Sequence, residues 1–367
     1  MRISDWSSDV CSSDLKIVTP RSAALLKIRS IQRRKVSKAG WSSPVREVRA
    51  SAPGKVNVIL RAGAPDADGY HELVTVFECL DVRESVTVRT SKSPGIRIET
   101  VAYGADGSVD EVATAAMADL DPATHLAYRA ARALQKLAAA GPWAQTAAGV
   151  SIHVDKRIPI AGGMAGGSAD AAAALVACNQ LWGLGLTLEQ LCQIGRTLGA
   201  DVPACIMGGM TLGQGRGDRL TSLLDPDQSS WPSHYWVMAR AHHGLSTPEV
   251  FRTLDQLREG GVPAQLSETE RQALCAGADA LASVLCNDLT APALHLYPEL
   301  ATTIHDAKDA GACAAILSGS GPTIAVLARD SKDADELAEA LRTSSEVSAV
   351  LPTSGPAVGA IVEEEES

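Results

Sequence analysis

A glycine-rich segment in the middle of the chain restricts the possible folds more than any other feature. Residues 159–170 read PIAGGMAGGSAD, with four glycines and three alanines. A strand-like segment at 149–155 precedes it, and an alanine-rich segment with high helix propensity at 171–178 follows it. Glycine lets the backbone turn sharply and lets a ligand come close. The arrangement predicts a strand, a ligand-binding loop and a helix in direct succession.

This segment is a candidate phosphate-binding loop. The first N–H groups of a helix have no intrahelical partner and lie at the positive end of its dipole, so they favour anions. A plain turn would need only one or two glycines. No Gly-Lys-Ser/Thr closes a Walker A motif, and the glycine spacing does not fit G-x-G-x-x-G. The candidate contacts are Pro159, Ile160, Ala161, Gly162, Gly163, Met164, Ala165, Gly166, Gly167, Ser168 and Ala169.

Ser168 has two compatible interpretations. Its hydroxyl could bind a phosphate oxygen or Mg²⁺, or it could simply form the N-cap of the helix that follows. The same loop holds one residue that restricts its geometry. Ala165 tolerates fewer backbone angles than glycine would.

Composition excludes several classes of protein. The 367 residues carry a formal net charge of −10, and the sequence pI is about 5.3, whereas nucleic-acid binders usually show a basic face. The eight cysteines are scattered singly, which favours buried or incidental thiols in a reducing compartment. No apolar run reaches the roughly 18 residues of a membrane span. We therefore expect a cytoplasmic protein with neither nucleic-acid nor membrane partners.

The chain divides into regions of different composition. Residues 1–48 begin with a Ser- and Asp-rich stretch and continue with many basic residues, which is typical of a disordered or wrongly assigned extension. The globular part is predicted to begin at 49 and to form two domains, 49–212 and 213–352. Residues 353–367 end in consecutive glutamates and are interpreted as an acidic, disordered tail.

Hydrophobic periodicity predicts a mixture of strands and helices in both parts. A Pro53-Gly54 turn is expected to lead into a strand, and residues 103–122 are expected to form an exposed loop. Thr187 and Gln190 match a capping box. The predicted strands are 56–60, 73–80, 84–89, 96–101, 149–155, 235–239, 314–317, 323–328 and 347–351. The predicted helices are 124–137, 187–198, 247–257, 267–285, 299–310 and 333–342.

Three motifs together resemble a known superfamily. They are Pro53-Gly-Lys55-Val-Asn57, the glycine-rich loop, and Ser318-Gly-Ser-Gly-Pro-Thr323. In this order they resemble the galactokinase, homoserine kinase, mevalonate kinase and phosphomevalonate kinase (GHMP) superfamily, over residues 49–350. The resemblance implies a two-domain α+β fold. Its N-terminal domain would be ribosomal-protein-S5-domain-2-like, and its C-terminal domain a ferredoxin-like α/β sandwich.

Further segments narrow the resemblance within the superfamily. They are Asp68-Gly-Tyr-His71, Leu198-Gly-Ala-Asp-Val-Pro203, Asn287-Asp-Leu289 and the Ser-Ala-Asp-Ala-Ala run after the loop. They resemble the branch that phosphorylates the 2-hydroxyl of 4-diphosphocytidyl-2-C-methyl-D-erythritol, a step of non-mevalonate isoprenoid synthesis. The resemblance implies ATP and Mg²⁺ as cofactors and this small molecule as the substrate. A monomer and a homodimer both stay open. The Mg²⁺ ligands stay open. Met164-Ala165 departs from the Leu-Gly that the superfamily commonly has there.

The resemblance assigns roles to individual residues. Lys55 would stabilise negative charge beside the acceptor hydroxyl, and Asp201 would be the general base. On their own, a lysine after a turn is usually solvated, and an aspartate at this position usually caps a short helix. Asn57, a polar residue in an apolar strand, would hold substrate or Lys55.

Three aromatic residues are candidates for recognising the cytosine ring. Tyr70 and His71 resemble the family's cytidine-binding loop, and Phe251 resembles its stacking platform. Core packing explains Phe251 equally well. Two alternative functions also stay open. One is a GHMP kinase for another small alcohol such as homoserine or mevalonate, and the other is a catalytically inactive, ligand-sensing relative.

Overall fold

Two long strands form the centre of the structure. The computed structural model describes residues 46–363, except 142–143, 145, 161 and 224–231. Strand β1 (Glu47–Pro65) turns through residues 66–70 into β2 (His71–Thr90), and the two pair antiparallel along most of their length. Their side chains are buried on both faces over long stretches, which explains why apolar residues occur almost without a break between Val56 and Leu60.

The remaining elements follow in a mixed order of strands and helices. The strands after β2 are β3 (Gly95–Ala102), β4 (Gly149–Lys156), β5 (Met210–Gly215), β6 (Arg219–Ser222), β7 (His234–Ala241), β8 (Cys286–Asn287), β9 (Ala314–Leu317), β10 (Thr323–Ala328), β11 (Val347–Gly355) and β12 (Ile361–Val362). The helices are α1 (Glu111–Ala118), α2 (Leu126–Ala139), α3 (Gly166–Leu181), α4 (Leu188–Arg196), α5 (Val202–Met207), α6 (Thr247–Leu257), α7 (Glu268–Leu274), α8 (Ala278–Ala282), α9 (Thr290–Leu296), α10 (Leu300–Asp309) and α11 (Ser331–Arg342), with a 3-10 turn at Pro122–Thr124.

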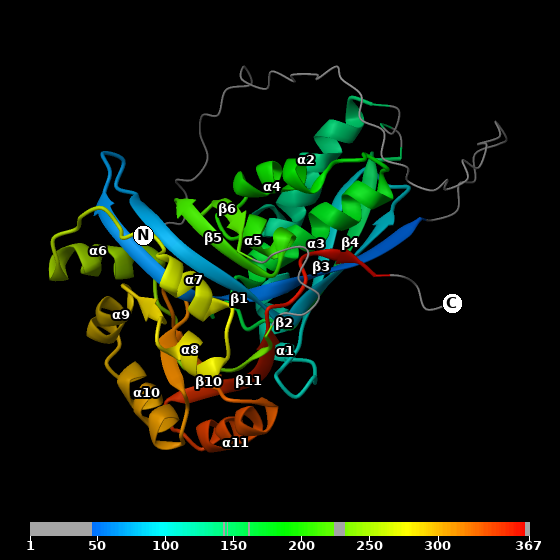
Figure 1. Cartoon of the computed structure of the whole chain (residues 1–367). Helices are drawn as coiled ribbons and strands as arrows, with labels where there is room; N and C mark the ends of the chain where they lie inside the picture. The colour runs from blue at the N-terminus through cyan, green and yellow to red at the C-terminus, as the bar shows by residue number, and fades with distance from the viewer. Residues whose placement is uncertain (1–45, 142–143, 145, 161, 224–231, 364–367) are drawn as a thin grey trace. The chain divides into compact units, whose positions relative to one another are not determined.

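The first sheet is built around β1 and β2. Its main path runs β12-β1-β2-β4-β3, with β5 and β6 added beside β2 and β8 beside β1. Helix α3 packs on β1 and β2, and α2 and α5 pack on α3, so that α2 to α5 gather on one side of the long strands (Figure 1). In this α+β arrangement, α3 begins where the glycine-rich loop ends and packs on the two long strands, so the loop lies beside β1.

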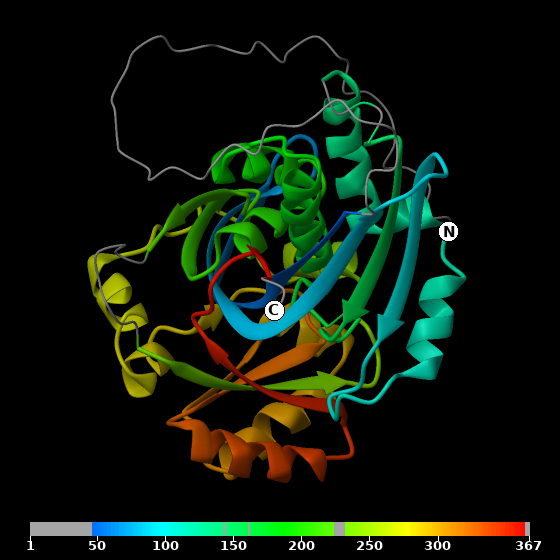
Figure 2. The ribbon, with the colours of Figure 1, turned by 90° about the vertical axis from the view of Figure 1, so that its right-hand side faces the viewer.

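The second sheet is antiparallel, with the order β11-β7-β10-β9. Helices α10 and α11 cover the face that points away from β1 and β2 (Figure 2). The opposite face carries Trp236 and Met238, which belong to the same hydrophobic cluster as the first sheet. One buried core therefore continues from residues of the first sheet into residues of the second.

A buried ion pair also joins the two sheets. His234 on β7 lies with its Nδ1 atom 3.0 Å from a carboxylate oxygen of Glu78 on β2, and its Nε2 atom lies 3.0 Å from the Ala276 carbonyl. Burial acts to lower the pKa of His234, but hydrogen bonding to Glu78 and its negative charge raise that pKa above the usual value. The described residues belong to one compact unit, and the division at 212/213 stays a prediction.

Several local predictions are confirmed. Helix α6 begins and ends where the periodicity placed it, with Pro248 in its first turn. The capping box of Thr187 and Gln190 is present at the start of α4. Within the described residues, no helix is both long and apolar enough to cross a membrane.

Two predictions in the first half of the chain are wrong. Pro53-Gly54 is not a turn, because β1 continues through it and only shifts register there, as expected for a β-bulge. Residues 103–122 are not a loop throughout, because α1 forms within them with Asp110 as its N-cap. Helix α1 has no buried residue, so no apolar stripe marks it in the sequence.

Two predictions in the second half also need correction, and one helix there was missed. The single helix predicted at 267–285 is two short helices, α7 and α8, separated near Gly277. Helix α9 was not predicted. Residues 353–363 are not a disordered tail, because β11 extends to Gly355 and β12 pairs with β1. Residues 46–48 likewise belong to the fold, whereas the rest of the predicted extension and residues 364–367 lie outside the described residues.

Candidate active site

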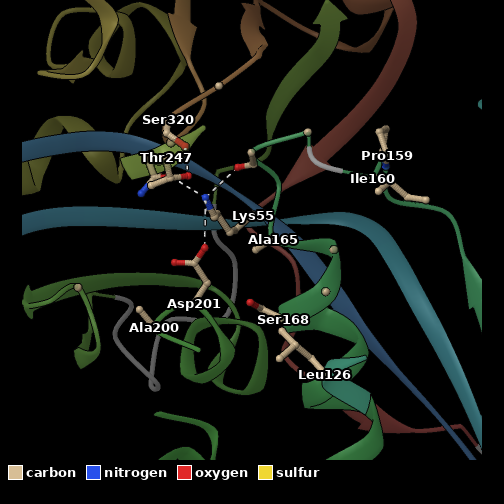
Figure 3. A pocket seen from close by; sticks show the side chains of 18 of the residues that line it. Lys55, Leu126, Pro159, Ile160, Ala165, Ser168, Ala200, Asp201, Thr247 and Ser320 are labelled. Carbon is tan, nitrogen blue, oxygen red and sulfur yellow. Dashed lines mark hydrogen bonds and ion pairs between the residues drawn. The ribbon is translucent and has the colours of Figure 1, made fainter. Parts of the chain in front are cut away.

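A cavity of about 690 Å³ lies where the glycine-rich loop meets β1, the start of α5 and the 319–321 loop. Lys55 and Asp201 point toward each other at one end of it, and Leu126, Pro159 and Ile160 lie at the other (Figure 3). The first end is polar and the second is largely apolar, so the cavity is suited to a ligand with one charged and one apolar part.

The glycine-rich loop has a geometry that demands small residues. Gly163 has φ +70°, and a Cβ atom there would lie 2.4 Å from the Ser318 carbonyl oxygen. Ala165 has φ 60° and is the only residue other than glycine with positive φ in the described part of the chain. It forms the N-cap of α3, so the unpaired N–H groups of the first helical turn begin at Gly166.

The structure corrects one interpretation of Ser168. It is the third residue of α3 and not its N-cap, which is Ala165. Ser168 lines the cavity, as do Pro159, Ile160, Gly162, Gly163, Ala165, Gly166 and Gly167. The side chains of Met164 and Ala169 are buried, and these two residues do not line the cavity. Ala161 lies outside the described residues.

Lys55 is buried and held in place by the loop. Its ammonium group donates to the Asn57 Oδ1 atom at 2.7 Å and to the Gly163 carbonyl at 2.8 Å, and its backbone N–H donates to the Met164 carbonyl at 3.1 Å. The side chain is 5% exposed, so it is not the solvated lysine that its sequence position alone would suggest.

Asp201 comes immediately before α5 and faces Lys55. Its Oδ2 atom lies 3.7 Å from the Lys55 ammonium nitrogen, and its side chain is 34% exposed. Its carboxylate makes no capping hydrogen bond to the helix. Asp201 therefore occupies the N-cap position of α5, but its carboxylate is not used for capping and is available to a group that enters the cavity.

The 318–321 loop lies against the glycine-rich loop. The Ser318 hydroxyl donates to the Gly163 carbonyl at 3.1 Å, so this carbonyl accepts from both Ser318 and Lys55. The Asn287 side-chain amide donates to the carbonyls of Leu317 and Gly319 and holds the loop from below. The Ser320 hydroxyl is 2.7 Å from that of Thr247, which the sequence did not single out.

The predicted cytidine-binding residues form a second group beside the cavity. The His71 Nε2 atom lies 2.8 Å from Asp255 Oδ1, and the His71 ring lies 4.8 Å from the Phe251 ring. Phe251 lines the cavity and also packs against a hydrophobic cluster that includes Val250 and Leu254. Its stacking role stays a prediction. Tyr70 stacks on Arg216, whose guanidinium carbon is 3.5 Å from the Tyr70 ring centre. Neither Tyr70 nor His71 lines the cavity itself.

A buried charge cluster beneath the start of α3 was missed. The Lys156 ammonium lies 2.8 Å from both Glu84 Oε1 and Asp170 Oδ2. Burial is the main cause that raises the pKa of Glu84, to about 8, while the charge of Lys156 acts against it. Asp170 Oδ1 is buried without a hydrogen-bond partner among the described residues. Asp170 stands in the loop motif, but no local pattern predicts its pairing with residues from β2 and β4.

These groups have the properties that phosphoryl transfer requires. Backbone N–H groups at a helix start can hold a polyphosphate, a fixed ammonium can stabilise developing negative charge, and a nearby carboxylate can take a proton. Within the described residues, no cluster of three or more His, Cys, Asp or Glu side chains could hold a metal.

Comparison with known proteins gives the same class. The description "GHMP kinases N terminal domain" matches residues 125–209, and "GHMP kinases C terminal" matches residues 271–347. A mevalonate kinase from L. major, solved with R-mevalonate, is 15% identical, covers 84% of this chain and 96% of its own, and superposes with a TM-score of 0.60. At this identity the likeness shows the fold alone. The chain has the two-domain fold of the GHMP kinases.

More similar relatives define the family within that class. The 4-diphosphocytidyl-2-C-methyl-D-erythritol kinase of Pseudarthrobacter chlorophenolicus is 42% identical over 321 residues, covering 86% of this chain and 94% of the relative. That of Streptomyces coelicolor is 43% identical over 318 residues, covering 86% and 99%. A crystal structure of 4-(cytidine 5'-diphospho)-2C-methyl-D-erythritol kinase is 31% identical, covers 84% and 99%, and has a TM-score of 0.62. The chain belongs to the 4-diphosphocytidyl-2-C-methyl-D-erythritol kinase family of small-molecule kinases.

Proposed function

We propose that this protein transfers the γ-phosphoryl group of ATP to the 2-hydroxyl of 4-diphosphocytidyl-2-C-methyl-D-erythritol, a step of non-mevalonate isoprenoid synthesis. The observation that carries the proposal is the approach of Lys55 and Asp201 to 3.7 Å at the cavity end bordered by the glycine-rich loop. The family membership supplies the identity of both substrates.

The chemistry follows from the positions of these two residues. The Asp201 carboxylate takes the proton of the substrate hydroxyl while that oxygen forms a bond to the γ-phosphorus and the bond to the ADP oxygen breaks. An alcohol is a poor acid, so the Lys55 ammonium assists by stabilising negative charge on the attacking oxygen and the transferring group. The two side chains therefore act as a pair.

The glycine-rich loop is the proposed binding site for the ATP phosphates. The N–H groups that begin at Gly166 lack helical partners and border the cavity. The proposed contacts are the eleven loop residues from 159 to 169. Those that line the cavity are the direct contacts, while Met164 supports the loop through its carbonyl. The apolar end of the cavity, lined by Leu126 and Ile160, is then the side on which the nucleoside lies.

Mg²⁺ is part of the proposal. Bound to the phosphates, it would neutralise their charge, and it usually takes only one or two protein oxygens. The Ser168 hydroxyl fits this use, because it lines the cavity and makes no hydrogen bond among the described residues. Asp201 offers the nearest carboxylate on the Lys55 side.

The proposed binding site for the cytidine part is the group around Phe251. Phe251 and His71 offer stacking surfaces, and Asp255 holds the His71 ring through its Nε2 atom. Tyr70 acts through Arg216, which lines the cavity. Asn57 lines the cavity and supports the site by holding Lys55.

The two alternatives are less well supported. Three solved homoserine and mevalonate kinases that resemble this chain are 15% to 20% identical to it, and such a likeness supports the fold alone. An inactive relative would have no need to keep Lys55 buried and facing Asp201. The seven cysteines in the described part of the chain are all free thiols, which agrees with action in the cytoplasm. A monomer or homodimer is part of the same proposal.

The test is a substrate panel. Purified protein is mixed with ATP, Mg²⁺ and the cytidine-linked methylerythritol, homoserine or mevalonate, and ADP and the phosphorylated product are quantified. We expect turnover with the first substrate only. Phosphorylation of another alcohol instead would support the first alternative, and binding without turnover of any substrate would support the second.

A further inference from the structure

We propose that Thr75 is a positioning residue that acts on Lys55 through Asn57. This inference rests on the proposed function, because it assigns Lys55 a part in phosphoryl transfer. Thr75 lies on β2, is 1% exposed, and stands opposite Leu60 of β1. Its hydroxyl belongs to a hydrogen-bond chain that ends at the Lys55 ammonium.

The direction of each hydrogen bond in this chain is determined. Lys55 can only donate, so the Asn57 atom at 2.7 Å from its nitrogen must be the carbonyl oxygen. The Asn57 NH₂ group then faces the Thr75 Oγ1 atom at 2.9 Å and donates to it. Thr75 is able to accept, because its single hydroxyl hydrogen is used on the Ile59 carbonyl at 2.8 Å.

The Thr75 hydroxyl therefore selects one of two orientations of the Asn57 amide. Asn57 is 2% exposed, so water does not compete for its polar atoms. The reverse orientation would point the NH₂ group at the Lys55 ammonium and leave two donors facing each other. The residues of this hydrogen-bond chain lie at a β-bulge between Asn57 and Ile59, where the register of β1 against β2 changes.

Fixing the Asn57 amide also fixes where the ammonium can lie. Two of its three hydrogens are used on Asn57 and on the Gly163 carbonyl. The third is directed to the side of Asp201, whose oxygen at 3.7 Å is too far for a good hydrogen bond. This third donor is the one that meets the reacting oxygens, and its aim depends on the first two bonds.

The matched variants follow from the fold. Thr75→Val removes the acceptor and keeps the shape, while Thr75→Ser restores the hydroxyl. Thr211→Val is the control, because Thr211 is also a 1% exposed threonine, on the neighbouring strand β5, and its hydroxyl has no partner among the described residues. A purely structural effect of burying an extra methyl group would appear in both valine variants.

Steady-state kinetics on the full chain give the first readout. We expect Thr75→Val to lower kcat by about 10- to 100-fold, because the ammonium is displaced from the reacting oxygens. KM for both substrates should stay within about threefold, and Thr75→Ser and Thr211→Val should keep kcat within about threefold of the native protein. A kcat for Thr75→Val equal to that of Thr211→Val, or no recovery in Thr75→Ser, would overturn the proposal.

A second readout does not depend on activity or on a variant that folds. In the native protein, NMR should show the Asn57 side-chain NH₂ protons exchanging with water far more slowly than those of free asparagine. Exchange as fast as in free asparagine would overturn the proposal even if Thr75→Val does not fold. If the native protein phosphorylates no cytidine-linked substrate, the proposed function fails, and this measurement still tests whether the Asn57 amide is held in a fixed hydrogen bond.

Discussion

The Lys55 ammonium nitrogen lies 3.7 Å from the Asp201 Oδ2 atom, close enough for strong attraction but beyond a good hydrogen bond. Lys55 comes from the first strand of the fold and Asp201 from the start of α5, nearly 150 positions later. The glycine-rich loop holds the lysine through Gly163, and the aspartate stays partly exposed. A hydroxyl that enters between them would meet a proton acceptor and a fixed positive charge together.

Removing the charge of Asp201 tests the base. Asp201→Asn keeps the size of the side chain and removes its basicity, so kcat should fall by about 10²- to 10⁴-fold. ATP binding, measured by calorimetry, should persist, because the loop is unchanged. Asp81→Asn, at an exposed position on β2, is the control and should keep full activity. Unchanged turnover in Asp201→Asn would remove Asp201 from the mechanism.

Replacing Lys55 tests the electrostatic part of the same pair. Lys55→Met has a similar shape and no charge, so kcat should fall by about 10²- to 10³-fold. Lys55→Arg should not restore activity, because a planar guanidinium cannot reproduce the contacts of an ammonium with Asn57 and Gly163. Lys332→Met, at a side chain 84% exposed, is the matched control. Recovery of normal turnover in the arginine variant would show that position matters less than charge.

Two substitutions distinguish a binding role of Phe251 from a packing role. Phe251→Leu removes the ring beside His71, and stacking on a base contributes about 1–3 kcal/mol, so KM for the cytidine substrate should rise about tenfold or more. KM for ATP should not change. Val250→Ala, a fully buried neighbour on α6, should lower the melting temperature without raising either KM. The same pattern in Phe251→Leu would mean that Phe251 only packs in the core.

The pair of Glu78 and His234 predicts a dependence of stability on pH. In the folded protein the pKa of His234 lies above its unfolded value of 6.5. The contribution of this pair to the free energy of unfolding is therefore fully present below pH 6.5. It is lost as the pH rises through the folded pKa. In Glu78→Gln, burial lowers that pKa and outweighs the smaller opposing effect of the hydrogen bond to the Ala276 carbonyl, so the contribution changes sign and is lost as the pH falls.

Urea unfolding of both proteins from about pH 6 to about pH 8.5 measures this difference. The free energy of unfolding of Glu78→Gln relative to the native protein should increase steadily across this range. His305→Gln is the control, because His305 is 73% exposed and pairs only with Asp309 on the surface. A difference that stays constant with pH would contradict the assigned charge of His234.

Ala165 predicts a gain in stability from a glycine. At φ 60° an alanine is strained by about 1–2 kcal/mol. Glycine would remove this strain. It would also increase the conformational entropy of the unfolded chain, which destabilises the folded protein by about 0.4–1 kcal/mol. Ala165→Gly should therefore stabilise the protein by roughly 0.5–1 kcal/mol. Ala340→Gly, at an exposed position of α11, should instead destabilise it by about 1 kcal/mol.

Local chemistry explains which elements could be predicted from the sequence. The capping box at Thr187 and the Pro248 at the start of α6 act within a few residues, so their signals are visible in the chain. The continuity of β1 through Pro53-Gly54 depends on pairing with β2, so the dipeptide alone suggests a turn. Helix α1 has no buried face and therefore no periodic pattern to detect.

The same distinction applies to the site. The glycine-rich loop, Lys55 and Asp201 stand in recognisable motifs, whereas Thr75 is one threonine in an apolar strand and matters only through Asn57. Lys156 resembles any basic residue at the end of a strand until Glu84 and Asp170 are placed beside it. Such contacts join residues far apart in the chain, and no periodicity or spacing encodes them.

The short strand β12 has a consequence for how the chain is made. Ile361 and Val362 pair with Ser51 and Ala50 of β1, and the backbone N–H of Glu363 donates to the Arg49 carbonyl. The edge of β1 at Ala50 and Ser51 is thus covered only after residues 361–363 have been synthesised. Until then this part of the edge stays open during translation, and an open strand edge is prone to pair with other chains. Truncation before residue 361 should leave a protein that expresses but aggregates.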